Sequence, residues 1–246
     1  MKLVERLLPS DGRTRLWVLL DPDSIPPAKV SDTAKSAEAG GADAILVGGS
    51  FLIHDRFDDL IQALKDATSL PVIIFPGNSR QISGFADGIL FTSLLSGRNP
   101  QYLIGEQIQA APIIKRLGLE VISTAYLLIE SGTTTSAQFV SDTHPIPRDK
   151  PMLVAAHAQA AELFGMEAVY LEAGSGAAMP VPPEIVKVVA DNTSLPVIVG
   201  GGINTVESAS QAARAGARAV VIGTAVEREG SGIIKLMASA IKGLPR

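Results

Sequence analysis

Glycine-rich turns follow three of the apolar runs in the second half of the chain. They are Gly174-Ser175-Gly176 after the run at 168–171, Gly200-Gly201-Gly202 after the run at 196–199, and Gly223-Thr224 after the run at 219–222. Glycines let backbone N–H groups approach an anion closely, and a helix that begins after such a turn adds a favourable dipole. These glycines could serve only to make tight turns, but their order along the chain favours a site for a phosphate group.

A carboxylate stands beside the first of these turns. Glu172 follows Tyr170-Leu171, and the two-residue period of a strand places Tyr170 and Glu172 on one face and Leu171 on the other. A carboxylate next to a phosphate site is electrostatically unfavourable unless it binds hydroxyl groups or accepts a proton. Glu172 is therefore a candidate catalytic residue. The alternative is a structural glutamate that is paired with a helix.

A second carboxylate and a hydroxyl follow two earlier runs. Asp21 follows the run at 16–20 and is expected at the mouth of the site, opposite the three glycine turns, and Ser50 ends the motif VGGS. One or two protein oxygens, completed by substrate phosphate oxygens and water, suit Mg²⁺. Asp21 could instead form an Asp-Pro turn or cap a helix, and Asp23 is expected to be a turn residue.

Other common catalytic side chains give no pattern. His54, His144 and His157 show no metal-binding spacing; His157 falls in a predicted helix and His144 in a polar loop, so all three are expected to be non-catalytic. The chain has no cysteine, which excludes disulfides, thiolate nucleophiles and cysteine-ligated metals.

Eight short apolar runs alternate with longer amphipathic stretches. Runs that are apolar on both faces are typical of parallel strands covered by helices, and several stretches between them open with Pro and close at Gly, as helices do. Strands are predicted at 16–20, 44–47, 71–75, 87–91, 119–123, 168–171, 196–199 and 219–222, and helices at 26–39, 56–67, 100–117, 151–164, 183–191, 205–215 and 231–241. This order predicts one α/β domain over residues 1–246, a (β/α)8 TIM-type barrel whose site lies at the C-terminal strand ends.

Two connections depart from the regular pattern. Only PGNSRQISGFA separates the third and fourth predicted strands, which is near the shortest crossover that can contain a helix. The third helix is therefore expected to be missing or replaced by an irregular segment. The link at 124–167 is long, and its polar centre SGTTTSAQFVSDTHPIPRD predicts a lid or a substrate wall.

A repeated hexapeptide supports the barrel. TSLPVI occurs at 68–73 and again at 193–198, where it leads into the third and seventh predicted strands. These two strands lie opposite each other in a barrel of eight, and a duplicated half-barrel produces this spacing.

Composition narrows the range of functions. The 246 residues are 46% hydrophobic with a formal net charge of −4, which suits one large core and, without a basic cluster, argues against a nucleic-acid partner. Glu5 and Arg6 interrupt any signal-peptide core. No run reaches the roughly 18 uncharged apolar residues of a membrane span, so the protein is expected to be cytoplasmic, without a transmembrane segment.

Five motifs resemble those of the geranylgeranylglyceryl phosphate synthase family, which includes bacterial members that make heptaprenylglyceryl phosphate. They are LLDPD at 19–23, VGGS at 47–50, YLEAGSGA at 170–177, VGGGI at 199–203 and IGTAVE at 222–227. The resemblance spans nearly the whole chain and implies a modified barrel in which the third helix is replaced, in agreement with the short third connection. The longer polar loop, and Ser50 where some members have Thr, point to the second of the family's two groups.

The resemblance implies a prenyltransferase that uses Mg²⁺. It would join the 3-hydroxyl of sn-glycerol 1-phosphate to an isoprenyl diphosphate, with geranylgeranyl diphosphate as the expected donor, and release diphosphate. Asp21 and Ser50 would hold the metal, and Glu172 and Asp21 would be catalytic. The glycerol phosphate would lie against Tyr170, Leu171, Glu172, Ala173, Gly174, Ser175, Gly176, Gly201, Gly202, Gly223 and Thr224.

One departure from the family pattern affects the phosphate. Some members carry a Lys two residues before the aspartate, where this chain has Leu19. Neutralisation of the phosphate would then depend more on backbone N–H groups. The prenyl tail is expected in an apolar groove over the third to fifth strands and the irregular third connection.

Two other functions remain open. A barrel isomerase or lyase of a phosphorylated sugar shares the glycine loops but typically needs an acid/base pair at other strand ends. A phosphate sensor or an inert scaffold would not need Asp21 and Glu172 to face one cavity. Mg²⁺-dependent release of diphosphate from a prenyl diphosphate separates the three.

The length of the prenyl chain is not predicted. Apolar stretches such as QYLIGEQIQAAPII at 101–114 are compatible with a homo-oligomer, a dimer or a hexamer.

Overall fold

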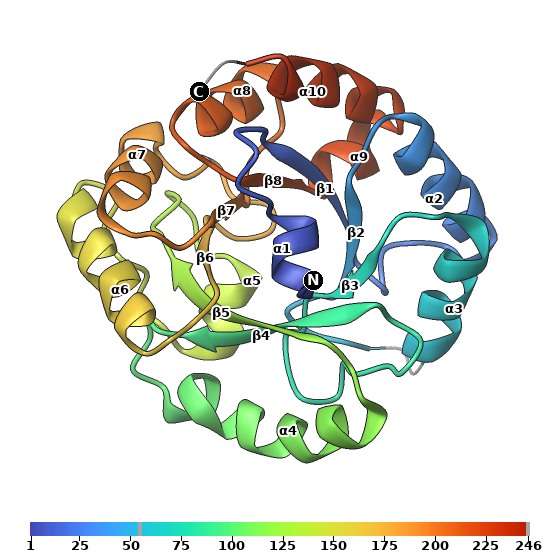
Figure 1. Cartoon of the computed structure of the whole chain (residues 1–246), viewed down its shortest axis with the longest axis horizontal. Coiled ribbons are helices and arrows are strands. Elements are labelled where there is room, and N and C mark those ends of the chain that lie inside the picture. Colours follow the sequence, from blue (N-terminus) through green and yellow to red (C-terminus); the bar gives the residue numbers. More distant parts are fainter. Residues whose placement is uncertain (54–55, 245–246) are drawn as a thin grey trace.

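The computed structural model describes residues 1–53 and 56–244, and it closes eight parallel strands into a barrel (Figure 1). Each strand pairs with the next one along the chain, and the first pairs with the eighth. The strands are β1 (Arg15–Leu20), β2 (Ala44–Val47), β3 (Val72–Ile74), β4 (Gly88–Leu94), β5 (Val121–Leu128), β6 (Ala168–Glu172), β7 (Val197–Gly200) and β8 (Ala219–Ile222). The predicted fold class is confirmed.

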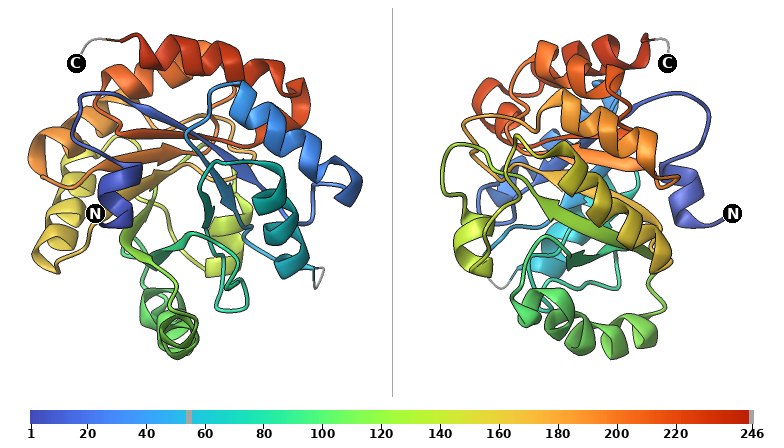
Figure 2. Two further views of the ribbon diagram at one scale, coloured as in Figure 1. Left: turned by 45° about the vertical axis from the view of Figure 1, so that its right-hand side comes forward. Right: turned by 90° about the vertical axis from the view of Figure 1, so that its left-hand side faces the viewer.

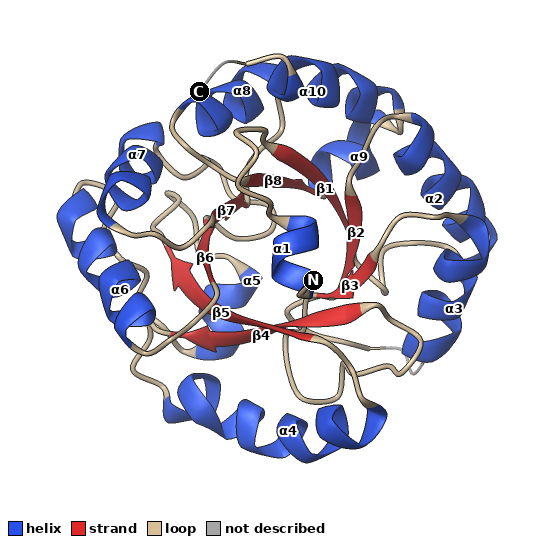
Figure 3. Ribbon diagram, viewed as in Figure 1, coloured by secondary structure: helices blue, strands red, loops and turns tan. Residues whose placement is uncertain are grey.

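Helices surround the barrel on its outer side (Figure 3). Those at the predicted places are α2 (Val30–Ala39), α3 (Phe57–Ala67), α4 (Glu106–Leu117), α6 (Pro151–Leu163), α7 (Pro183–Asn192), α8 (Val206–Arg214) and α10 (Gly232–Lys242). A 3₁₀ turn (Pro27–Lys29) precedes α2, and a π-helical turn (Gln101–Gly105) precedes α4. None of the helices within the described residues is long and apolar enough to cross a membrane.

Three short helices were not predicted from the sequence: α1 (Leu3–Leu7), α5 (Ser136–Ser141) and α9 (Thr224–Glu229). Each is five or six residues long, too short to show a clear helical period in the sequence. Figure 2 places α1 and α5 at opposite ends of the barrel. Leu3 and Leu7 pack against the inner barrel residues, so α1 covers the end at which the strands begin.

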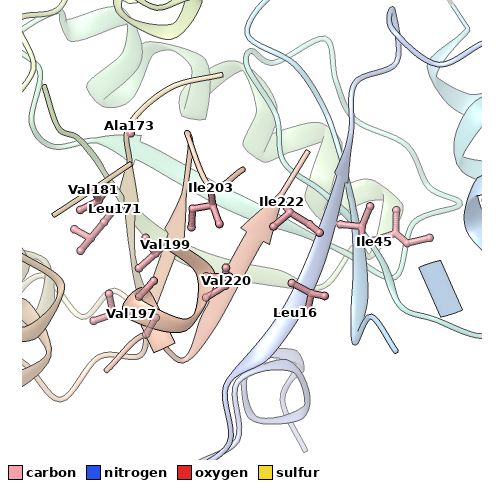
Figure 4. Close-up of a cluster of buried hydrophobic side chains, with 14 of the residues drawn as sticks. Leu16, Ile45, Leu171, Ala173, Val181, Val197, Val199, Ile203, Val220 and Ile222 are labelled. Atoms are coloured by element: carbon pink, nitrogen blue, oxygen red, sulfur yellow. The ribbon is translucent and has the colours of Figure 1, made fainter. Parts of the chain in front are cut away.

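Alternating side chains of the strands form two apolar layers. Leu16, Ile45 and Val199 belong to the outer layer between strands and helices (Figure 4). Trp17 and Leu46 belong to the layer that fills the barrel. Because both faces of each strand are buried, the runs are apolar throughout, and this is the pattern on which the strands were predicted.

The third connection has no helix, as predicted. The described stretch 75–87 between β3 and β4 contains neither helix nor strand. Two polar residues in it, Gln81 and Ser83, are nevertheless almost completely buried. This connection therefore packs into the fold and does not lie on its surface as an ordinary loop.

Strand β5 extends further than its apolar run indicated. The strand was predicted to end at Ser123, yet the pairing with β4 continues to Tyr126 and the pairing with β6 to Leu128. The hydroxyl of buried Thr124 donates to the Ile122 carbonyl at 2.9 Å, so a polar side chain is accommodated inside the barrel. The extension carries Tyr126 toward the C-terminal end.

Candidate active site

A cavity of about 290 Å³ opens at the C-terminal ends of the strands. Its lining includes most of the site residues predicted from the sequence, namely Asp21, Ser50, Tyr170, Glu172, Ser175, Gly201, Gly202, Gly223 and Thr224. Leu171, Ala173, Gly174 and Gly176 do not line it. The side chains of Leu171 and Ala173 belong to the outer apolar layer instead (Figure 4), so neither side chain faces the cavity.

The turns after β6 and β7 pack directly on each other. Gly201 and Gly202 have φ of 78° and 67°, and Gly174 has φ of 100°, values that favour glycine. A Cβ atom on Gly201 would lie 2.1 Å from Oε1 of Glu172 and 2.5 Å from the nitrogen of Gly174. Glycine at 201 therefore lets the backbone of one turn approach the carboxylate of the other.

Glu172 lies at the centre of this contact, with a side chain that is 5% exposed. Its Oε1 accepts a hydrogen bond from the Gly174 N–H at 2.5 Å. Burial raises the pKa of Glu172 to about 7, although the Gly174 N–H and the nearby Tyr170 hydroxyl both favour the carboxylate. A carboxyl group with this pKa can exchange a proton near neutral pH.

Three aromatic rings form the floor beneath Glu172. The Phe75 and Tyr170 rings stack with centroids 4.7 Å apart, and Tyr126 lies 5.9 Å from Phe75 and 5.7 Å from Tyr170. The Tyr170 hydroxyl is buried and makes no well-formed hydrogen bond with the described residues. Burial and the charge of Glu172 raise the pKa of Tyr170 well above its usual value, so this hydroxyl stays protonated.

Asp21 has two environments, one for each oxygen. Oδ1 accepts a hydrogen bond from the Asp23 N–H at 2.8 Å, which is the turn-forming role considered above. Oδ2 lies against Gly49, where a Cβ atom would approach it to 2.9 Å. Burial raises the pKa of Asp21.

The expected position of Asp21 opposite the glycine turns was wrong. In the closed barrel β1 pairs with β8, so Asp21 stands next to the turn of Gly223. Glu227 on α9 also lines the cavity, and partial desolvation and the charge of Asp21 raise the pKa of Glu227. Glu227 was not singled out from the sequence, because α9 was not predicted; its place within the motif IGTAVE was the available signal.

The charged side chains among the described lining residues of the cavity are all acidic. Asp21, Glu106, Glu172 and Glu227 line it, and no Lys, Arg or His is present among the lining residues that the structure describes. An anionic ligand would therefore be neutralised by backbone N–H groups or by a metal cation.

The other arm of the cavity is apolar. It runs over β3, β4 and the third connection and is lined by Phe75, Ile82, Ile89, Phe91, Leu94, Ala110 and Val140. Helix α5 contributes Ser136, Ala137 and Val140 to one wall. The long polar link thus forms part of the cavity wall, as predicted.

The histidines lie elsewhere. His144 is exposed in the loop after α5, and Nδ1 of His157 on α6 is 2.7 Å from the Leu153 carbonyl. Neither lines the cavity. His54 falls outside the described residues.

Comparison with known proteins identifies close relatives. The model of the PcrB family matches residues 12–241. Proteins named geranylgeranylglyceryl phosphate synthase from Korarchaeum cryptofilum and Flavobacterium johnsoniae are 45% and 50% identical to this chain, covering 98% and 89% of it and 100% and 90% of their own lengths.

A solved structure extends the likeness to the whole fold. It is (S)-3-O-geranylgeranylglyceryl phosphate synthase from Thermoplasma acidophilum in complex with its substrate sn-glycerol-1-phosphate. It superposes with a TM-score of 0.93 at 38% identity, over 99% of this chain and 100% of that one.

Proposed function

The chain belongs to the PcrB family, the family of the geranylgeranylglyceryl phosphate synthases, and on that basis we propose that it is a prenyltransferase. It joins the 3-hydroxyl of sn-glycerol 1-phosphate to C1 of an isoprenyl diphosphate through an ether bond. The observation that carries this function is the two-part cavity, with glycine turns and Glu172 at one end and an apolar arm at the other.

The glycine turns suit the phosphate of the acceptor. Gly201, Gly202, Gly223 and Thr224 line one end of the cavity, together with Ser175. Because no cationic side chain is found among the described lining residues, the phosphate is bound by the backbone N–H groups of these turns and by the hydroxyls of Ser175 and Thr224. Leu19 lines this cavity where some family members have Lys, which is consistent with such a backbone-based site.

Glu172 serves as the base for the glycerol hydroxyl. The Gly174 N–H holds its carboxylate in place, and a pKa of about 7 suits proton transfer near neutral pH. The hydroxyl oxygen forms the new bond to C1 of the donor, the bond from C1 to the diphosphate oxygen breaks with its electron pair, and the hydroxyl proton passes to Glu172. Holding both substrates in one cavity raises their effective concentration.

The donor set at the mouth fits Mg²⁺. Asp21 and Ser50 supply two oxygens with no positive side chain beside them among the described lining residues. The described residues contain no group of three or more His, Cys, Asp or Glu arranged to hold a metal, in keeping with an ion that keeps water and substrate phosphate oxygens as ligands. When bound there, Mg²⁺ would neutralise the diphosphate and improve it as a leaving group.

The apolar arm suits the prenyl tail of geranylgeranyl diphosphate. It lies over β3, β4 and the third connection, where the groove was expected. A phosphorylated sugar has no use for such an arm, so the cavity favours the prenyltransferase over the isomerase or lyase.

The chain is also proposed to form a homo-oligomer, a dimer or a hexamer. Ile104 and Ile108, in the apolar stretch noted above, are 55% and 64% exposed, and such residues are commonly covered in oligomers. Light scattering of the purified protein tests this assembly; a monomer at micromolar concentration would contradict it.

A direct assay tests the reaction. The purified protein, incubated with sn-glycerol 1-phosphate, geranylgeranyl diphosphate and Mg²⁺, is expected to release diphosphate and form the ether, detected by mass spectrometry. sn-Glycerol 3-phosphate serves as the matched acceptor and is expected to react poorly. No ether product in the complete mixture would overturn the proposed function.

A further inference from the structure

Gln81 is a polar side chain that the reaction described above does not use. It lies in the third connection and is 0% exposed. Its Oε1 accepts hydrogen bonds from the N–H groups of Gly49 at 3.2 Å and Gly77 at 3.3 Å, and its Nε2 donates to the Gly49 carbonyl at 2.8 Å. One side chain therefore satisfies both backbone groups of Gly49.

Gly49 stands between the two residues proposed to hold the metal. It precedes Ser50 in the chain, and Oδ2 of Asp21 lies 2.9 Å from the position that a Gly49 Cβ would take. Residues 48–53 form neither helix nor strand, so regular structure does not fix their backbone. The Gln81 amide supplies hydrogen bonds that a strand or helix would otherwise provide.

Other residues of the third connection also contact the loop at 48–50. A Cβ atom on Gly77 would lie 2.1 Å from the Gly49 carbonyl oxygen and 3.0 Å from Cα of Ser50. A Cβ on Gly48 would lie 1.8 Å from the Phe75 carbonyl oxygen and 3.1 Å from Oε1 of Gln81. The two segments thus contact each other through their backbones, with the Gln81 amide inserted between them.

We propose that Gln81 is a positioning residue that holds the Gly49–Ser50 backbone against Asp21 and thereby sets the geometry of the Mg²⁺ site. This inference rests on the proposed function, in which Asp21 and Ser50 hold the ion. It also gives the third connection a role: where the barrel lacks a helix, an irregular segment supports the neighbouring loop. Residues that orient metal ligands typically change metal affinity by about 10- to 100-fold when they are replaced.

Two uncharged variants test the role of the amide. Gln81→Met keeps the length of the side chain but loses all three hydrogen bonds, and Gln81→Asn keeps the amide but is one methylene too short to span both glycines. Ser83→Ala is the matched control, because Ser83 lies in the same connection, is 1% exposed, and accepts a hydrogen bond from the nearby Phe85 N–H.

The readout is Mn²⁺ affinity, measured by electron paramagnetic resonance without substrates on proteins whose folding is checked by circular dichroism. Both Gln81 variants are expected to bind Mn²⁺ about tenfold or more weakly than the wild type, with Ser83→Ala unchanged. In enzyme kinetics, the Mg²⁺ concentration needed for half-maximal activity should rise in both Gln81 variants. The KM for sn-glycerol 1-phosphate should stay within about twofold of the wild-type value.

The outcomes separate the two hypotheses. If a folded Gln81 variant binds Mn²⁺ as tightly as the wild type while Asp21→Asn loses Mn²⁺ binding, the metal site stands and the role of Gln81 is overturned. If Gln81→Met is too unstable to measure, Gln81→Asn decides. Absence of Mn²⁺ binding in the wild type, both without substrates and with the prenyl diphosphate bound, removes the metal site of the proposed function and this inference with it.

Discussion

Glu172 is the residue on which the proposed chemistry depends most. It is buried, it accepts the Gly174 N–H, and it contacts the turn of Gly201 so closely that a methyl group there would collide with it. Taking a carboxylate out of water costs free energy, and burial accordingly raises its pKa. A structural role would more often pair such a group with a cation, and no cationic side chain is found among the described residues that line this cavity.

Replacement of Glu172 by Gln tests its role as a base. The variant keeps the shape of the side chain but can no longer accept a proton, so kcat is expected to fall by about 10²- to 10⁴-fold. Stopped-time assays of ether formation measure this, with the melting temperature as the check on folding. Turnover within a few-fold of the wild type would exclude Glu172 from proton transfer.

The raised pKa of Glu172 also predicts how stability depends on pH. Since its pKa is about 7 in the folded protein and 4.5 is the ordinary value, the native state binds more protons than the unfolded state between these values. Stability attributable to this group therefore falls as pH rises from about 4.5 to about 7.

Urea unfolding at a series of pH values measures this effect as a difference between two proteins. Relative to Glu172→Gln, the wild type is expected to lose about 3 kcal/mol in free energy of unfolding between pH 4.5 and pH 8. The other carboxyl groups titrate in both proteins and cancel in the difference. Parallel stability curves would show that the pKa of Glu172 is not raised.

At the scale of elements, the sequence was most informative where burial is complete. Strands with both faces covered produce apolar runs, so all eight strands overlap their predicted ranges; β5, whose sequence is interrupted by Ser123 and Thr124, is the one that extends well beyond its prediction. Helix α5 begins at a polar cap, in which the Thr135 hydroxyl accepts the Gln138 N–H, whereas α9 begins at Gly223 without a side-chain cap; both are too short to show a helical period in the sequence. Glu227 on α9 and the wall residues on α5 could therefore not be assigned to the cavity from sequence alone.

The repeated hexapeptide has a structural basis. Glu38 of α2 accepts a hydrogen bond from the Thr68 hydroxyl at 2.8 Å, and Glu162 of α6 accepts one from Thr193 at 3.2 Å. The two copies lead into β3 and β7, so the same helix-to-strand interaction recurs on opposite sides of the barrel. The repeat thus marks an equivalent turn, which the spacing in the sequence indicated without revealing the partner glutamates.

The wall formed by α5 predicts which substrate a mutation should affect. Val140→Asp places a charge beside the apolar arm, and burial of a charge against a lipid tail is unfavourable. The KM for the prenyl diphosphate is expected to rise about tenfold or more, equivalent to about 1.4 kcal/mol, while the KM for sn-glycerol 1-phosphate changes little.

Phe139→Asp is the matched control for this wall. Phe139 lies on the same helix, is 80% exposed and does not line the cavity. Its replacement is expected to leave both KM values near wild type. If both variants raise the KM values for both substrates equally, the cause is a general disturbance of α5, and Val140 does not contact the donor.

At the scale of the whole molecule, the closed ring of strands couples all parts of the chain. β1 pairs with β8 as well as with β2, so neither half of the barrel can complete its inner apolar layer alone. We propose that residues 1–246 unfold as one domain. Calorimetry is expected to show a single transition; two transitions, or a stable half-barrel after limited proteolysis, would contradict this.

The most direct test of the account is a crystal structure with sn-glycerol 1-phosphate bound. The phosphate is expected within hydrogen-bonding distance of the backbone at Gly201, Gly202 and Gly223, with a glycerol hydroxyl directed at Glu172. A phosphate bound elsewhere on the barrel, or a glycerol whose hydroxyl groups point away from Glu172, would contradict the proposed site.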